Sequence, residues 1–186
     1  MIYGCKYWND RDRFYIQTNN PTEEILQKSN VEHYLETCGP TSAVNCLAAM
    51  GHKVEIDTPG GYQPQPEEVL NDFFNDPRNY LDLKKEREGI DPSDYLGNEI
   101  AQYYPLAVKR VFGIRCRFIF ASWADIVENL KEGLACQICF KVPGHFVAAV
   151  AYDDDTKEII YNDSMGKFNA RLKNGKNLKN YCIVYY

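Results

Sequence analysis

A cysteine, a histidine and an aspartate in this sequence have the side-chain types that thiol-based acyl transfer uses. Cys38 stands in Glu-Thr-Cys-Gly-Pro-Thr-Ser, immediately before a helical pattern of apolar residues. A thiol at a helix N-terminus lies at the positive end of the helix dipole, near free backbone N–H groups that stabilise a negative charge on sulfur. The Cys38 amide could also contribute to an oxyanion hole, and Gly39 would let a substrate carbonyl approach the sulfur. The alternative is an ordinary buried thiol before a helix.

The base and its orienting group are expected on a hairpin near the end of the chain. His145 opens an apolar strand, the turn-rich residues 153–157 follow, and a second strand leads to Asp163. With a five-residue turn, Val147 lies opposite Asp163, and His145 is a diagonal neighbour on the same face. A tighter even register would place His145 directly opposite Asp163, whereas an odd register would put them on different faces. In the even registers the carboxylate can orient the imidazole that a thiol nucleophile needs.

Other residues with reactive side chains receive a structural interpretation. His33 and His52 lie in polar, turn-like surroundings without a second ligand at metal spacing, so no metal site is predicted. Cys136 and Cys139 have the spacing of a redox or zinc motif, but the alternating apolar residues around them predict a strand. Residues three apart in a strand point to opposite faces, so this pair cannot easily form a disulfide or chelate a metal.

Composition excludes several classes of protein. The chain has 186 residues, of which 45% are hydrophobic, enough for one domain with its own core. The net charge of −5 argues against bulk affinity for nucleic acid or an anionic membrane. No apolar run approaches the ~18 residues of a membrane span, and the N-terminus lacks the apolar region of a signal peptide. The seven cysteines are odd in number and irregularly spaced, which favours reduced thiols and a cytoplasmic location.

The elements that must position these residues follow from apolar periodicity and from Gly and Pro breakers. Helices are expected at residues 21–29, 39–50, 67–74, 98–112 (kinked or split at Pro105) and 123–131, the last with a capping box from Ser122 and Asp125. Strands are expected at residues 14–17, 115–121, 134–142, 144–152, 158–162 and 181–186. Helices come first and a mostly antiparallel sheet comes last, which is an α+β layout. Residues 58–66 are expected to form a surface loop within one domain.

Two sequence blocks resemble a known family. The Cys-Gly-Pro-Thr-Ser helix start is similar to the nucleophile motif of papain-like cysteine peptidases, and more closely to their bacteriocin-processing (double-glycine leader) peptidase-like branch. The later Gly-His-Phe-Val-Ala-Ala-Val-Ala-Tyr and Ile-Tyr-Asn-Asp resemble the histidine and aspartate block of that branch. The order Cys, His, Asp at separations of 107 and 18 positions agrees as well.

The resemblance implies a papain-like fold in which the nucleophile helix packs on the C-terminal sheet. Residues 1–186 would form a single peptidase domain, with residues 58–110, which carry no family motif, as an insertion that shapes the cleft. By the same resemblance Cys38 would be the nucleophile, His145 the general base and acid, and Asp163 the orienter of the imidazole. The substrate would be a peptide or protein, and neither a cofactor nor a metal would be required.

The family also uses a glutamine upstream of the cysteine as an oxyanion-hole donor. Gln17, at the end of a predicted strand and 21 residues before Cys38, is the first candidate, and Gln27, in a predicted helix, is the second. Glu32 occupies the spacing at which papain-like proteins often carry this glutamine, but an anionic side chain could not donate. Ser164 stands where the family often has proline.

These features predict a soluble cysteine peptidase that hydrolyses peptide or isopeptide bonds through an acyl-enzyme. A transamidase or acyltransferase could use the same triad, because the acceptor is chosen by cleft shape and water exclusion. A non-catalytic binding module that retains the fold is a third hypothesis. The departure at the oxyanion position favours this third hypothesis, and the intact cysteine, histidine and aspartate oppose it.

Overall fold

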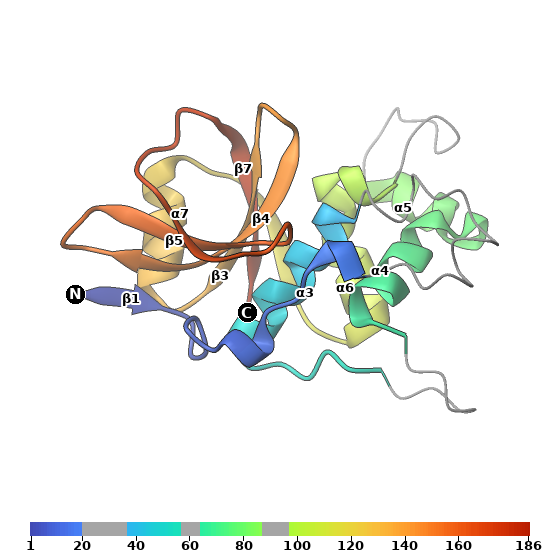
Figure 1. Ribbon diagram of the computed structural model, residues 1–186. Coiled ribbons are helices and arrows are strands. Elements are labelled where there is room, and N and C mark those ends of the chain that lie inside the picture. The colour runs from blue at the N-terminus through green and yellow to red at the C-terminus, as the bar shows by residue number, and fades with distance from the viewer. Residues whose placement is uncertain (20–36, 57–63, 87–96) are drawn as a thin grey trace.

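The computed structural model describes residues 1–19, 37–56, 64–86 and 97–186 and places them in an α+β fold. An antiparallel sheet with strand order β2-β7-β3-β4-β5-β6 forms its centre, and β1 (Ile2–Gly4) pairs with β4 off this path. The strands of the main path are β2 (Cys116–Phe120), β3 (Ala135–Phe140), β4 (His145–Asp153), β5 (Glu158–Asp163), β6 (Lys167–Leu172) and β7 (Leu178–Tyr185). Figure 1 shows this sheet on the left and most of the helices on the right.

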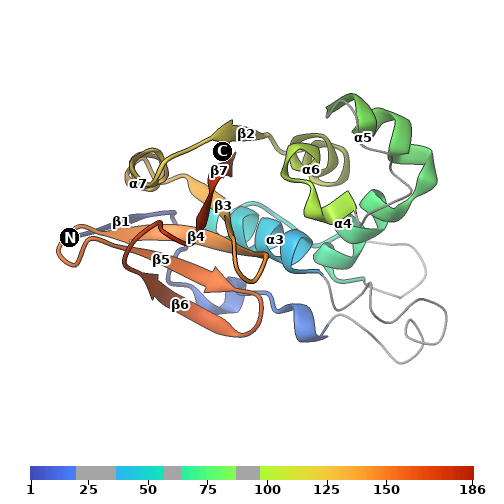
Figure 2. The same ribbon diagram turned by 90° about the horizontal axis from the view of Figure 1, so that it is seen from above.

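Helices cover the sheet on both faces. Helix α3 (Cys38–Met50) packs on one face, and α7 (Trp123–Lys131) packs on the other. Helices α4 (Pro66–Asn75), α5 (Tyr80–Glu86) and α6 (Tyr104–Phe112) share the core of α3, and α6 also contacts β2. Figures 1 and 2 both show α3 between the sheet and α4. The candidate nucleophile therefore begins the most central helix of the molecule.

Strand β4 separates two hydrophobic cores. Its residues Phe146, Ala148 and Val150 belong to the core around α3, whereas Val147 and Ala149 belong to the core under α7. All five are at most 5% exposed. Because helices cover both faces, the strand shows a continuous apolar run rather than an alternation of apolar and polar residues.

Helix α3 forms where the apolar pattern predicts it. Residues 39–49 are all buried, which matches a helix that is apolar on every side. Gly51 ends the helix with a φ of 95°, and its N–H donates to the Ala48 carbonyl oxygen. Glycine adopts this left-handed conformation without the steric cost of a Cβ atom, so the helix stops here for a local reason.

Most of the other predicted elements are confirmed. The capping box of α7 is present, with Asp125 N–H donating to Ser122 Oγ at 3.3 Å and Ser122 N–H donating to the Asp125 carboxylate at 2.7 Å. Helix α6 begins one residue before Pro105 and follows two 3-10 turns, η5 (Gly97–Glu99) and η6 (Ala101–Tyr103), as the predicted split requires. The helix predicted at residues 21–29, and the loop predicted at residues 58–66 up to residue 63, lie outside the described residues.

The strand predicted at residues 14–17 is wrong. Two 3-10 turns, η1 (Arg11–Arg13) and η2 (Gln17–Asn19), flank this segment. Tyr15 makes its backbone hydrogen bonds to a side chain of α3: its N–H donates to Asn45 Oδ1 at 2.8 Å, and its carbonyl accepts from Asn45 Nδ2 at 3.0 Å. An asparagine side chain thus takes the place of a neighbouring strand. The pattern analysis also did not predict β1, β6 and α5.

The β4–β5 hairpin carries a bulge that decides which side chains meet at its open end. The turn has four residues, 154–157, instead of five, so Tyr152 pairs with Ile159, one position out of the predicted register. A register shift before Ala151 adds one residue to β4. Beyond this bulge Ala148 pairs with Asn162, as predicted. The same register, continued by one position, places residue 147 opposite residue 163.

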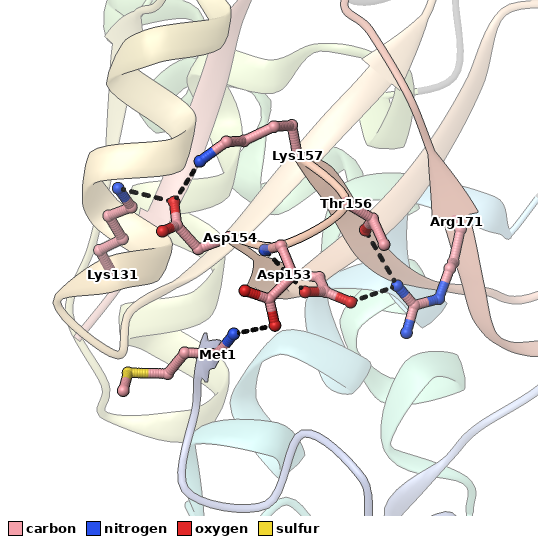
Figure 3. A network of polar contacts seen from close by, with 8 residues as sticks. Met1, Lys131, Asp153, Asp154, Thr156, Lys157 and Arg171 are labelled. Atoms are coloured by element: carbon pink, nitrogen blue, oxygen red, sulfur yellow. Dashed lines mark hydrogen bonds and ion pairs between the residues drawn. The ribbon is translucent and has the colours of Figure 1, made fainter.

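Charged side chains from neighbouring elements hold the turn of this hairpin (Figure 3). Lys131 Nζ of α7 lies 3.5 Å from Asp154 Oδ1, and Arg171 Nη1 of β6 lies 2.7 Å from Asp153 Oδ2. The backbone N–H of Asp154 donates to the carbonyl of Met1 at 2.9 Å, next to β1. Single surface ion pairs contribute little stability, but these contacts connect three elements to one turn. They hold the closed end of the hairpin while the bulge sets the register of the open end.

Glu67, in the first turn of α4, is a buried carboxylic acid. Its side chain is fully buried, and neither carboxyl oxygen has a hydrogen-bond partner among the described residues. Burial raises the pKa of Glu67 from 4.5 to about 7, against a smaller opposing effect of its own backbone N–H. The folded protein therefore holds this proton more tightly than the unfolded chain. The free energy of unfolding therefore benefits most from this raised pKa below pH 4.5, and this benefit is lost as the pH rises through about 7.

We predict that Glu67→Gln is more stable than the unaltered protein at pH 8, by about 1–3 kcal/mol, because the amide does not ionise. Urea unfolding at pH 5 and pH 8 measures this: the unaltered protein loses stability over that interval, and the variant loses less. Glu128→Gln, at an exposed position of α7, is the matched control and should follow the unaltered protein. Identical pH dependence for all three proteins would contradict the prediction.

Candidate active site

The three side chains predicted to form a triad come from three elements and meet at one end of the sheet. Cys38 is the first residue of α3, His145 is the first of β4, and Asp163 is the last of β5. His145 Nε2 lies 2.7 Å from Asp163 Oδ1, and the Cys38 thiol lies near enough to the same imidazole to raise its pKa. The structure thus places the imidazole between the thiol and the carboxylate.

Asp163 remains charged although it is largely buried, with a side chain that is 10% exposed. Burial by itself would raise its pKa. The hydrogen bonds from His145 and from the Met165 N–H, at 3.0 Å, and the nearby positive charges outweigh burial and hold the pKa of Asp163 below its ordinary value. A fixed negative charge therefore faces the imidazole.

The carboxylate of Asp163 raises the pKa of His145. The hydrogen bond to Asp163, followed by the nearby Cys38 thiol, raises the pKa of His145 from 6.5 to about 9, against the opposing effect of burial. The ring is therefore protonated at neutral pH, and a positive charge faces the Cys38 sulfur. Such a ring stabilises a thiolate and can give its proton to a leaving group. The stability that the charged ring contributes is full below pH 6.5 and is lost as the pH rises through about 9.

Gly39 has a packing role in the structure. A Cβ atom at this position would lie 2.0 Å from the Tyr104 hydroxyl oxygen and 2.7 Å from the Asn98 carbonyl oxygen. The Tyr104 hydroxyl donates to that carbonyl oxygen at 2.7 Å, so both groups are held in place. The space beside Gly39 is filled by Tyr104, the first residue of α6, and by Asn98 of η5, whereas the sequence predicted that a substrate carbonyl would approach there.

Gln137 ties the first turn of α3 to the sheet. Its side-chain amide, fully buried in β3, donates to the Gly39 carbonyl and to Ser42 Oγ, each at 2.9 Å. The amide oxygen accepts from the Tyr185 hydroxyl of β7 at 2.6 Å. Because buried polar groups hold their partners firmly when each is satisfied, this network fixes the position of the candidate nucleophile relative to the strands.

Cys38 and His145 line a cavity of about 650 Å³. Residues 98–102 line it on one side, and the other residues around it include Cys139, Lys179 and Tyr181. The volume falls in the range of sites that bind small molecules or a few residues of a peptide. No motif in the sequence pointed to residues 98–102 or to Lys179 and Tyr181, because only the packing of the helices against the sheet brings them to this cavity.

Gln17 also lines this cavity, although the predicted strand that was to carry it is absent. It is 8% exposed and begins η2. Its backbone N–H donates to the Ser164 carbonyl at 2.9 Å, and its Oε1 accepts from Ser164 Oγ at 2.5 Å. The alternative residues Gln27 and Glu32 lie outside the described residues.

All seven cysteines are free thiols, and only Cys38 and Cys116 are half-buried rather than buried. Cys136 belongs to the core under α7 and Cys139 to the core around α3, which confirms that the two lie on opposite faces of β3. Cys139 reaches the same cavity as Cys38, which its spacing did not predict. Burial raises the pKa of Cys116 to about 12, so this thiol is a useful internal comparison for Cys38.

Among the described residues, the other candidate metal ligands do not gather around a common point. A ring nitrogen of His52 lies 2.6 Å from the Tyr186 carbonyl oxygen, whereas His33 lies outside the described residues. In the described ranges, no three His, Cys, Asp or Glu side chains are close enough together to hold a metal ion. None of the helices in these ranges has the length and apolar character needed to cross a membrane.

An α+β fold with a cysteine-bearing helix packed on an antiparallel sheet is consistent with the papain-like class of cysteine peptidases. A family model described as the Peptidase_C39 like family matches residues 13–186. The chain therefore belongs to the Peptidase_C39 like family. A search of the curated proteins found no match. The family match includes residues 58–110, where the sequence carries no recognised motif.

We predict that Asp163→Asn lowers the pKa of His145 by about one unit or more, because the largest cause of its raised value is removed. An NMR pH titration of the His145 ring, assigned with His145→Gln, measures this. The titration midpoint should lie near pH 9 in the unaltered protein and nearer 6.5 to 8 in the variant. Asp154→Asn, at the far end of the hairpin, is the control. An unchanged midpoint in Asp163→Asn would remove the aspartate from this role.

Proposed function

We propose that this protein is a cysteine peptidase with Cys38 as nucleophile, His145 as general base and acid, and Asp163 as the orienter of the imidazole. The observation that carries the proposal is the imidazole hydrogen-bonded to Asp163 at 2.7 Å and lining the same cavity as the Cys38 thiol. Membership of the Peptidase_C39 like family supports a peptide or protein as substrate. The histidine and aspartate block further favours a position near the bacteriocin-processing branch.

The proposed reaction proceeds through an acyl-enzyme. The Cys38 thiolate attacks the carbonyl carbon of a peptide or isopeptide bond, a carbon–sulfur bond forms, and the carbonyl π electrons move onto oxygen. When the tetrahedral intermediate collapses, the carbon–nitrogen bond breaks and the amine takes its proton from the His145 imidazolium. The neutral imidazole then removes a proton from water, which attacks the thioester, releases the acid and restores the thiolate.

Two groups are assigned to the oxyanion. The Cys38 backbone N–H lies in the first turn of α3, where N–H groups have no acceptor within the helix. The Gln17 side chain lines the same cavity as the sulfur and is the proposed second donor. Donors held in advance around the developing charge are a large part of acyl-transfer catalysis, since they need no rearrangement during the reaction.

The described part of residues 58–110 is proposed to shape the substrate cleft within a single domain. Residues 98–102 line the cavity, and Leu70, Leu83 and Val108 share one hydrophobic core with α3. The exposed residues around the cavity include Glu99 and Lys179, of opposite charge. An extended peptide would pass between the two walls and present its carbonyl to Cys38.

We predict that iodoacetamide at pH 6 alkylates Cys38 at least tenfold faster than Cys116, because the protonated His145 lies near Cys38, whereas burial raises the pKa of Cys116 to about 12. Brief labelling followed by mass spectrometry of the modified peptides measures both rates in one sample. His145→Ala should remove most of the difference, whereas His52→Ala is the matched control. Equal reactivity of the two half-buried thiols would favour the hypothesis of a non-catalytic binding module.

We predict that a peptide library incubated with the protein yields free carboxylic acids as the main products, and that Cys38→Ser yields almost none. The same incubation with an added primary amine separates hydrolysis from acyl transfer, because both start from the same thioester. Products are identified by mass spectrometry. If amine adducts predominate even at low amine concentration, the protein is a transamidase or acyltransferase instead.

A further inference from the structure

Ser164, the residue after β5, makes two contacts with Gln17 that the triad does not use. Ser164 is fully buried, and Gln17 is 8% exposed. The Ser164 carbonyl oxygen accepts the Gln17 backbone N–H at 2.9 Å, and the Ser164 hydroxyl donates to Gln17 Oε1 at 2.5 Å. One residue therefore holds both the backbone and the side chain of the proposed oxyanion donor.

The contact with the Ser164 hydroxyl favours one of the two orientations of the Gln17 side-chain amide, and the orientation decides whether its nitrogen or its oxygen is available to the substrate. A primary amide carries two N–H donors on nitrogen and only lone pairs on oxygen. It stabilises an oxyanion through its nitrogen, whereas its oxygen would repel the developing charge. A hydroxyl that donates to Oε1 favours the orientation with the oxygen toward Ser164. Without the hydroxyl, the two orientations of the amide would differ less in free energy.

We propose that Ser164 is a positioning residue: its hydroxyl fixes the Gln17 amide so that Nε2 donates to the oxyanion of the tetrahedral intermediate. The inference rests on the proposed function and adds a determinant of the same site. Two consecutive residues then serve two parts of the reaction, since Asp163 holds the imidazole at 2.7 Å and Ser164 holds the oxyanion donor. A single peptide unit at the end of β5 thereby couples the position of the base to that of the oxyanion hole.

Two small reagents distinguish the positioning of the oxyanion donor by Ser164 from a general structural role of this residue. Iodoacetamide reacts when the Cys38 sulfur displaces iodide from a saturated carbon, and no oxyanion forms. With p-nitrophenyl acetate the sulfur attacks a carbonyl carbon, and the carbonyl oxygen becomes negative in the tetrahedral intermediate. Collapse then breaks the ester carbon–oxygen bond, releases p-nitrophenolate and leaves an acetyl thioester on Cys38. Only the second reaction uses the oxyanion hole.

Ser164→Ala is expected to slow acetylation of Cys38 by p-nitrophenyl acetate about tenfold or more. Its alkylation by iodoacetamide should stay within about twofold of the unaltered rate, because the thiol and imidazole are unchanged. Gln17→Ala should show the same selective loss. The double variant should acetylate no more slowly than Gln17→Ala alone, since the hydroxyl acts through the amide. Stopped-flow release of p-nitrophenolate, with mass spectrometry at Cys38, measures these rates.

Ser122→Ala is the matched control, because it also removes a hydrogen-bonded hydroxyl, at the cap of α7. It should leave both rates unchanged. Equal slowing of acetylation and alkylation in Ser164→Ala would indicate a structural role and overturn the inference. Multiplicative losses in the double variant would also overturn it. If Cys38 of the unaltered protein is not acetylated at all, the proposed function fails first, and this outcome is distinct from the other two.

Discussion

The hydrogen bond between His145 and Asp163 is the interaction on which the candidate site depends, and it depends in turn on one bulge. The turn of the β4–β5 hairpin sets an odd register, which would place the two side chains on different faces of the sheet. The extra residue before Ala151 restores the even register at the open end. A local irregularity in the backbone thus decides whether an imidazole and a carboxylate can meet at 2.7 Å.

The candidate nucleophile is positioned by the burial of its helix and by contacts from neighbouring elements. Helix α3 is buried from residue 39 to residue 49, and Gln137 joins its first turn to the sheet. The start of α6 packs against Gly39 through the Tyr104 hydroxyl. The described contacts around the helix start, from Gln137 and Tyr104, hold the first turn of α3 against the sheet and α6. This rigidity is what acyl transfer by a thiol requires of its scaffold.

Local signals in the sequence predicted α3 and α7 well, because the information is carried by adjacent residues. Gly51 ends α3, and Ser122 with Asp125 starts α7. The strand predicted around Tyr15 failed because its backbone partner is the side chain of Asn45, which no pattern in residues 14–17 could reveal. The turn length of the hairpin was wrong by one residue, yet the predicted pairing near Asp163 holds because the bulge compensates.

The sequence by itself determined the helix that begins at Cys38, the strand that begins at His145, and the choice of Asp163 as the carboxylate. These follow from short-range periodicity, breakers and residue chemistry, together with the family resemblance. Only the tertiary structure decided that residues 98–102 line the cavity, that Cys139 reaches it, and that Ser164 holds Gln17. Each of these contacts joins segments distant in the chain, so their proximity depends on how helices and sheet pack together and leaves no periodic signal in any one segment.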